Sequence, residues 1–162
     1  MKAITLNGQM KINLDVSKNI NEHFKKYIGG EELENGFVIH PKIGTNQAES
    51  TFIELPGSLE FYHFGLTQFK VPIQMHTINE PESDWFLIHI NLSHVAQEKL
   101  INGEQIKFQK HLPIGILFIG PNLEMHTLLP PDTNVEVASI RFNRSFLMKY
   151  LEKNIPFSAG RL

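Results

Sequence analysis

The middle of the chain, residues 36–142, alternates between apolar and polar positions with the two-residue period that is typical of β-strands. The clearest case is the segment 85–92, where we expect Phe86, Ile88 and Ile90 on one face and Leu87, His89 and Asn91 on the other. Further strands are predicted at 37–40, 49–55, 59–65, 69–76 and 135–142. The run 114–119 is apolar throughout, which predicts burial on both of its faces.

Turn-forming residues separate these segments at spacings of about 8 to 12 residues. Pro56-Gly57 and Pro130-Pro131-Asp132 are turn signals, and Asn102-Gly103 predicts a tight hairpin between 99–101 and 105–108. Eight or so short strands punctuated in this way predict a β-sandwich or barrel. Helices of 10–15 residues do not alternate with the strands, so a doubly wound α/β fold is not expected.

Helical periodicity is confined to the two ends of the chain. Near the N-terminus, Asn19 is positioned to cap a short helix with Glu22 as its capping-box partner, and Gly29-Gly30 ends it. The apolar face of this helix is expected to contain Ile20, Phe24, Tyr27 and Ile28. The residues before it, 1–16, alternate weakly and predict an edge strand or an arm.

A second helix follows the last strand, with Asn143 or Ser145 as its cap and Pro156 at its end. Its apolar stripe consists of Phe146, Leu147, Tyr150 and Leu151. We therefore divide the chain into an N-terminal arm and helix (1–35), a β-barrel (36–142), and a C-terminal helix with the start of a linker (143–162). The tail after residue 156 has no packing pattern and is typical of a linker that continues into another domain.

Composition excludes several functions. The chain has 162 residues, 41% of them hydrophobic, which fits one domain with a sizeable core. Its 15 Lys and Arg against 17 Asp and Glu leave no basic surface for nucleic acid. The absence of cysteine excludes disulfides, thiolate chemistry and cysteine zinc sites. No apolar run approaches a membrane span of about 20 residues, so we expect a soluble, cytoplasmic protein without membrane contact.

One motif points to a family. In residues 112–126, Gly115 precedes an apolar strand, Gly120-Pro121 breaks it, and His126 follows. This pattern resembles the second half-motif of cupins. The resemblance implies a cupin-like double-stranded β-helix, or jelly-roll barrel, in which His126 starts a strand and faces the mouth or interior.

The wider layout, an N-terminal helix, an all-β middle and a C-terminal helix, is similar to the N-terminal regulatory domain of AraC-type transcription regulators over residues 36–154. The resemblance implies binding of a small-molecule effector and homodimerisation through the C-terminal helix, by Phe146, Leu147, Tyr150 and Leu151. It also implies that DNA is bound only by a separate helix-turn-helix domain, which this chain does not contain.

Polar residues on the predicted strands are the candidates for effector binding. Gln74, His76, His89 and His126 are expected to offer hydrogen bonds among apolar barrel walls. The effector's identity stays open, and so does the possibility that the barrel's own side chains fill it.

Two other functions remain as alternatives. One is a small metal-dependent cupin enzyme, of the dioxygenase or isomerase type. Enzymatic cupins carry His-x-His and a Glu in their first half-motif, and no His-x-His occurs here. Its metal ligands would have to come from His63, His76, His89 and His126 on different strands. The other is a stand-alone small-molecule-binding cupin. The favoured prediction is a binding domain, not an enzyme, with neither metal nor cofactor.

Overall fold

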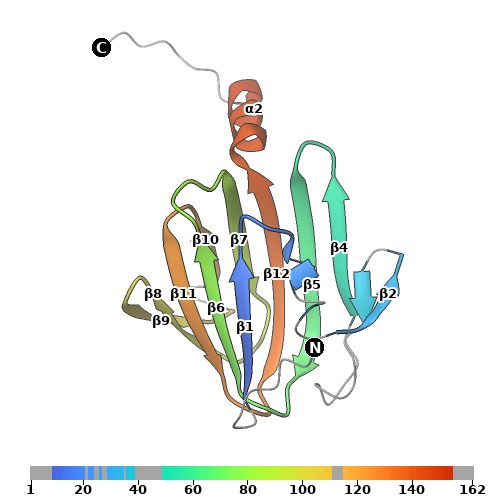
Figure 1. Cartoon of the computed structure of the whole chain (residues 1–162), viewed down its shortest axis with the longest axis vertical. Coiled ribbons are helices and arrows are strands. Elements are labelled where there is room, and N and C mark those ends of the chain that lie inside the picture. Colours follow the sequence, from blue (N-terminus) through green and yellow to red (C-terminus); the bar gives the residue numbers. More distant parts are fainter. Residues whose placement is uncertain are drawn as a thin grey trace.

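The computed structural model describes residues 9–20, 22–23, 26, 29–34, 36–38, 49–110 and 115–154. Most of these residues belong to two β-sheets that enclose one core (Figure 1). In spatial order, the five-stranded sheet contains β1 (Met10–Asp15), β6 (Ile73–Asn79), β11 (Leu123–Leu129), β8 (Gln97–Ile101) and β9 (Glu104–Phe108). The seven-stranded sheet contains β10 (Ile116–Ile119), β7 (Trp85–Asn91), β12 (Asn134–Asn143), β5 (Leu59–Gln68), β4 (Glu49–Leu55), β3 (Gly36–Val38) and β2 (Glu31–Leu33).

The connection of strands β5 to β12 defines the fold. Except in the β8–β9 hairpin, successive strands from β5 onward lie in opposite sheets, which gives the orders β10-β7-β12-β5 and β6-β11-β8-β9. Eight strands divided in this way between two facing sheets form a jelly roll, the architecture of cupins. The prediction of a mainly β, cupin-like jelly-roll barrel is therefore confirmed.

The N-terminal strand β1 completes the five-stranded sheet by pairing parallel to β6. Its apolar residues Ile12 and Leu14 point into the core, as the weak alternation of this segment predicted. Arg141 on β12 fixes the chain just after β1, because its side chain donates to the carbonyl oxygens of Val16 (2.8 Å) and Ser17 (3.1 Å). The first residues of the described chain are thus part of the barrel wall.

The buried Arg141 side chain is balanced by two further groups. Its Nη1 donates to both carboxylate oxygens of Glu60 on β5, and the guanidinium lies 3.5 Å from the ring centroid of Trp85 on β7. A planar guanidinium suits all these contacts, since it offers donors around its edge to the carboxylate and the two carbonyl oxygens and a flat face to the ring. Arg141 therefore joins β5, β7, β12 and the end of β1.

The two helical segments have the caps that the sequence predicted. The backbone N–H of Glu22 donates to Asn19 Oδ1 (3.2 Å), and residues 20, 22, 23 and 26 are helical. Phe24, Tyr27 and Ile28 lie outside the described residues. The C-terminal helix α2 (Arg144–Asn154) begins at Asn143, whose Oδ1 accepts the N–H of Phe146 (2.9 Å). Of the two proposed caps, Asn143 is the one used.

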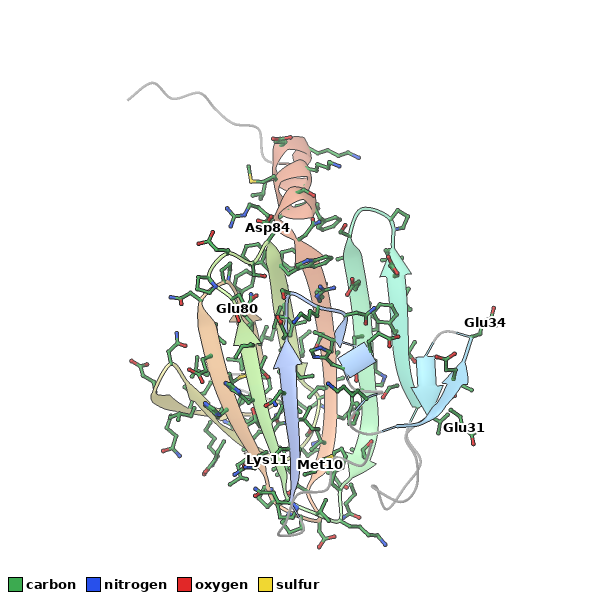
Figure 2. All side chains as sticks on the ribbon, in the orientation of Figure 1. Met10, Lys11, Glu31, Glu34, Glu80 and Asp84 are labelled. Atoms are coloured by element: carbon green, nitrogen blue, oxygen red, sulfur yellow. The ribbon has the colours of Figure 1, made fainter. Side chains whose placement is uncertain are left out.

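Helix α2 continues directly from β12 and projects beyond the end of the barrel (Figure 1). At its base Arg144 pairs with Asp84 (3.2 Å), which Figure 2 labels at the foot of the helix, and Phe146 packs against Phe142. No helix in the described ranges has the length and apolar character needed to span a membrane.

The two strand predictions that depended on a single local signal had opposite outcomes. The expectation that 114–119 is buried on both faces is wrong: Ile116 is 63% and Phe118 56% exposed. The reason is position: Ile116 and Phe118 lie on the outer face of β10, which among the described strands pairs with β7 alone at the edge of its sheet. The Asn102-Gly103 hairpin is confirmed, with φ of 45° and 87° at the two turn residues.

Candidate functional site

The barrel interior contains a small cavity between the two sheets. The volume of this cavity that water-sized molecules can occupy is about 60 Å³. Most of the surrounding side chains are apolar, but polar ones from β6, β7, β8, β11 and β12 also reach it, namely Thr77, His89, Gln97, Lys99, Thr127 and Ser139. The interior is thus largely filled by the protein's own side chains and keeps a polar cluster around the remaining space.

Lys99 on β8 is the charged member of this cluster. It is only 3% exposed, and its Nζ donates to Thr127 Oγ1 (2.9 Å) and lies 5.0 Å from the centroid of the Phe108 ring. Within the described residues no carboxylate pairs with it. Burial lowers the pKa of Lys99 to about 7, since an ammonium group loses its hydration there.

His89 on β7 stands next to Lys99 in the cavity wall. Its Nδ1 is hydrogen-bonded to Ser139 Oγ (3.0 Å), and its ring stacks on Phe108 with centroids 5.3 Å apart. Burial, and secondarily the charge of Lys99, lowers the pKa of His89 to about 3. At neutral pH it is a neutral imidazole. The prediction that His89 points into the barrel is confirmed.

Gln97, two residues before Lys99 on the same face of β8, is also buried at 4% exposure. Its Nε2 has no hydrogen-bond partner among the described residues. An unsatisfied buried amide is costly, and each such case in a folded protein calls for a specific explanation. Gln97 and Lys99 therefore both have N–H groups that face the interior and are available to donate hydrogen bonds to a ligand.

Sequence reasoning did not identify Gln97 or Lys99. Burial in β8 follows the pattern buried-exposed-buried-exposed, so Gln97 and Lys99 point inward, whereas Glu98 and Leu100 point outward. The one usable signal was the Asn102-Gly103 turn, because a two-residue hairpin fixes Ile101 opposite Glu104 and thereby sets the register of every residue before it.

The other three predicted binding residues lie outside the barrel. On β6, Ile73, Met75 and Thr77 reach the cavity; on β11, Met125, Thr127 and Leu129 do so. Gln74, His76 and His126 occupy the alternating positions and face outward, so the expectation that His126 faces the mouth or interior is wrong. They line a groove of about 430 Å³ on the outer face of the five-stranded sheet.

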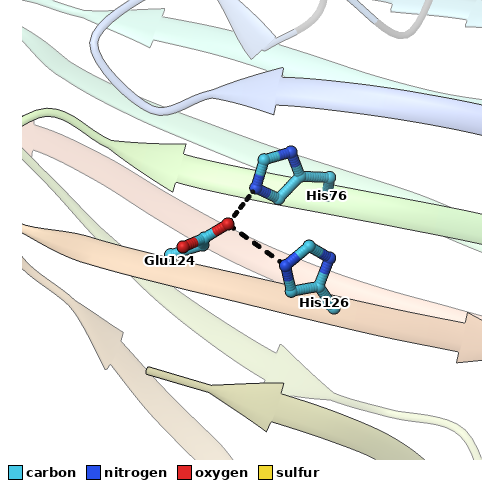
Figure 3. Close-up of side chains that lie close together, drawn as sticks. All are labelled: His76, Glu124 and His126. Atoms are coloured by element: carbon cyan, nitrogen blue, oxygen red, sulfur yellow. Dashed lines mark hydrogen bonds and ion pairs between the residues drawn. The ribbon is translucent and has the colours of Figure 1, made fainter. Parts of the chain in front are cut away.

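Within this groove, His76 and His126 are directly opposite each other on β6 and β11. Their rings are stacked, with centroids 4.4 Å apart and planes 2° from parallel. The Nε2 atoms of both point to the same oxygen of Glu124, at 2.8 Å from His76 and 3.2 Å from His126 (Figure 3). These hydrogen bonds, first from His76 and then from His126, lower the pKa of Glu124.

An interior metal of the kind that enzymatic cupins imply does not fit this cavity. Of the described residues that line it, His89 is the one histidine, and neither Asp nor Glu is present. The four histidines weighed as ligands do not converge either: His63 pairs with Glu136 (3.1 Å), His89 is interior, and His76 and His126 are on the outer face. The described interior therefore lacks a set of transition-metal ligands.

The four residues predicted for dimerisation lie along α2. Phe146 packs on Phe142 with ring centroids 6.3 Å apart, so it attaches the helix to the barrel. Tyr150 is 57% exposed, and Leu147 and Leu151 are half-buried. The helix, which projects beyond the barrel (Figure 1), thus offers a partly exposed apolar stripe.

Comparison with known proteins gives likeness of structure only. No family model matches the sequence, and a search of curated proteins found no significant match. Three solved structures with a similar chain course are a cupin 2 conserved barrel domain protein from Salinispora arenicola, the Cnp3 cupin domain from Schizosaccharomyces pombe and a predicted oxalate decarboxylase from Thermotoga maritima.

The similarity to each is distant. The Salinispora protein is 12% identical over 65% of this chain and 84% of its own, with a TM-score of 0.42. The Schizosaccharomyces domain is 9% identical over 76% and 80%, with a TM-score of 0.47. The Thermotoga protein is 13% identical over 67% and 92%, with a TM-score of 0.41. The jelly-roll assignment rests on the strand order, and no function follows from these likenesses.

Proposed function

We propose that this chain is a non-enzymatic, cytoplasmic ligand-sensing and dimerisation domain of the AraC-regulator type, whose ligand is a small carboxylate bound inside the barrel by Lys99. The observation that carries the proposal is the buried Lys99 ammonium without a carboxylate partner in the described chain. DNA binding would belong to a further helix-turn-helix domain.

The chemistry of the cavity favours an anion. An unpaired buried ammonium is unfavourable, and a carboxylate placed beside it would supply the missing charge and raise the pKa of Lys99 from about 7. The free Nε2–H of Gln97 would donate to a second oxygen of the same ligand. His89 is neutral at pH 7, so it offers the ligand a hydrogen-bonding group but no second positive charge.

The size of the cavity limits the ligand. A volume of about 60 Å³ corresponds to about four to six water positions. Monocarboxylates with two or three carbon atoms, such as acetate or pyruvate, match this space, whereas sugars and aromatic acids do not. The apolar remainder of the wall suits the methyl group of such a ligand.

A path from the cavity to the dimerisation helix runs through one strand. Val135, Val137 and Ser139 of β12 line the cavity, and β12 continues without interruption into α2. A ligand that alters the position of β12 would therefore alter how α2 meets a second copy of the chain. Such coupling requires that the two arrangements bind the ligand with different affinity.

Isothermal titration calorimetry and thermal unfolding with sodium acetate test the proposal. We expect acetate to bind and to raise the melting temperature, whereas acetamide, which has the same shape but no charge, does neither. Lys99→Met keeps the volume of the side chain and removes the charge, and we expect it to abolish acetate binding. Equal binding of acetate by the wild type and Lys99→Met, or none by the wild type, would refute the carboxylate site.

The alternatives predict different results. A stand-alone binding domain would bind acetate without any change in the dimer dissociation constant, whereas a sensing domain changes it. A metal-dependent enzyme with an interior metal would lose that metal on His89→Ala. Analytical ultracentrifugation with and without acetate, together with elemental analysis of the two proteins, separates the three.

A further inference from the structure

We propose that His76, Glu124 and His126 form a binding site for a divalent transition metal, with Zn²⁺ as the reference ion, on the outer face of the five-stranded sheet. The site is separate from the interior cavity, since it is formed by the outward-facing residues of β6 and β11. It goes beyond the proposed ligand-sensing function and differs from the expectation, made from sequence, that no metal binds.

The backbone brings the three ligands together. His76 and His126 are cross-strand partners in the β6–β11 ladder, and Glu124 precedes His126 by two positions on the same face of β11. Asn102 Oδ1 accepts the backbone N–H of Glu124 (2.9 Å), which holds this part of β11. The ligand pattern therefore depends on strand register and not on a mobile loop.

The distances are close to those of a coordination sphere. The two N···O separations are 2.8 and 3.2 Å, and all three ligand atoms lie within 4.8 Å of one another. Metal–ligand bonds of about 2.0–2.2 Å in tetrahedral arrangement separate neighbouring ligand atoms by about 3.3 Å. Glu124 and His126 are exposed and His76 is half-buried, so side-chain rotation would adjust the three separations to that spacing while the strands stay in place.

Metal binding would replace the hydrogen bonds seen in Figure 3. In the metal-free arrangement both Nε2–H groups donate to Glu124. To coordinate, each neutral imidazole moves its proton to Nδ1 and offers the Nε2 lone pair, and an imidazolium releases one proton to solvent. The parallel rings must also turn toward the ion, because a lone pair lies in the plane of its ring.

The ligand types select the class of metal. Two imidazoles and one carboxylate suit Zn²⁺, Ni²⁺, Cu²⁺ or Fe²⁺, whereas Mg²⁺ and Ca²⁺ prefer oxygen ligands alone. Three protein ligands leave at least one position open to solvent. That position adjoins the groove lined by Gln74, Leu100 and Leu128.

Calorimetric titration of tag-free, chelator-treated protein with ZnCl₂, checked by elemental analysis after dialysis, tests the site. We expect one Zn²⁺ per chain in the wild type, a loss of affinity of at least about tenfold in Glu124→Gln, and a larger loss in His76→Ala and His126→Ala. His94→Ala is the matched control, because His94 is an exposed histidine outside the triad, and it should bind as the wild type does.

Two further measurements make the result decisive. Circular dichroism and melting temperatures in chelator should be alike for all four variants, since the substituted side chains are on the surface. Lys99→Met should keep its Zn²⁺, which separates this site from the interior cavity. Unchanged Zn²⁺ affinity in both His76→Ala and His126→Ala, equal loss in His94→Ala, or no binding by the wild type would overturn the proposal.

Discussion

The ammonium group of Lys99 lies 5.0 Å from the centre of the Phe108 ring, on neighbouring strands of the β8–β9 hairpin. In the described chain, this buried charge is stabilised by the face of the Phe108 ring and by one hydrogen bond to the hydroxyl group of Thr127. A cation over an aromatic ring gains about 0.5–2 kcal/mol, which is less than the cost of removing an ammonium group from water. The wild-type barrel is therefore less stable than its packing allows.

Lys99→Met should stabilise the protein in the absence of ligand. Methionine fills a similar volume and needs no hydration, so we expect the free energy of unfolding to rise by about 1–4 kcal/mol at pH 7. Urea denaturation measures this change. Lys107→Met is the control, because Lys107 is an exposed lysine of the same hairpin and should change stability by less than about 0.5 kcal/mol. A destabilised Lys99→Met would mean that the charge is already balanced inside the barrel.

Stability should increase with pH where Lys99 titrates. The pKa of Lys99 is about 7 in the folded protein, against the 10.5 of an ordinary solvated lysine, which is the value expected for the unfolded chain. Between these values the unfolded chain binds the proton and the folded protein does not, so the free energy of unfolding rises with pH. The stability difference between Lys99→Met and the wild type should shrink from pH 7 to pH 10.5. A difference independent of pH would contradict the lowered pKa.

His89 should produce a second pH dependence on the acid side. Its pKa is lowered from 6.5 to about 3 on folding. As the pH falls below 6.5 the unfolded chain takes up a proton that the folded protein refuses, and stability decreases until about pH 3. His89→Gln keeps a hydrogen-bonding group near Ser139 and should reduce this acid loss, as measured by denaturation at pH 4 and pH 7. An equal decrease in the free energy of unfolding between pH 7 and pH 4 in the wild type and His89→Gln would contradict the lowered pKa of His89.

The Arg141–Glu60 ion pair should be far more important for stability than the exposed one at the base of α2. Glu60→Gln leaves the buried guanidinium without its counter-charge, which costs about 3–5 kcal/mol. Asp84→Asn removes the exposed partner of Arg144 and should cost at most about 1 kcal/mol. Comparison of the two variants by thermal unfolding tests the contrast, and similar losses in both would refute it.

Dimerisation through α2 predicts a specific sensitivity to charge. Leu147→Glu and Tyr150→Glu place a carboxylate on the apolar stripe and should convert a dimer into a monomer, as measured by light scattering during gel filtration. Lys149→Glu makes a larger charge change at an exposed position off this stripe and should leave the dimer intact. Wild-type protein that remains monomeric at high concentration would exclude this interface.

Most strands were predictable because alternation and turn residues are local signals. Segment 49–55 and the 85–92 segment, observed as 85–91, agree with β4 and β7. Burial of β10 was not predictable from its apolar run, because that run does not reveal whether the strand is central or at an edge. Phe69 was placed in the strand that contains Met75, yet β6 starts only at Ile73.

The candidate sites were harder to predict, for a related reason. The alternation that placed Ile73 and Met75 together on β6 also requires Gln74 and His76 on the opposite, outer face. For His126 on β11, the resemblance to cupins was the misleading signal, because it implied a position at the mouth or interior. Glu124 contacts both histidines only because the register between β6 and β11 places His76 opposite His126, about 50 positions apart in the chain. No local pattern contains that register.

The contact between Arg141 and the Val16 carbonyl joins residues 125 positions apart, and this has a consequence during synthesis. Strand β1 leaves the ribosome before the other strands of the barrel, yet the side chain that fixes its end is on β12, the last of these strands to emerge. Until then the edge of β6 has no secured partner and can pair with another nascent chain. Folding should therefore be slow and late, and most prone to aggregation while the polypeptide is still being made.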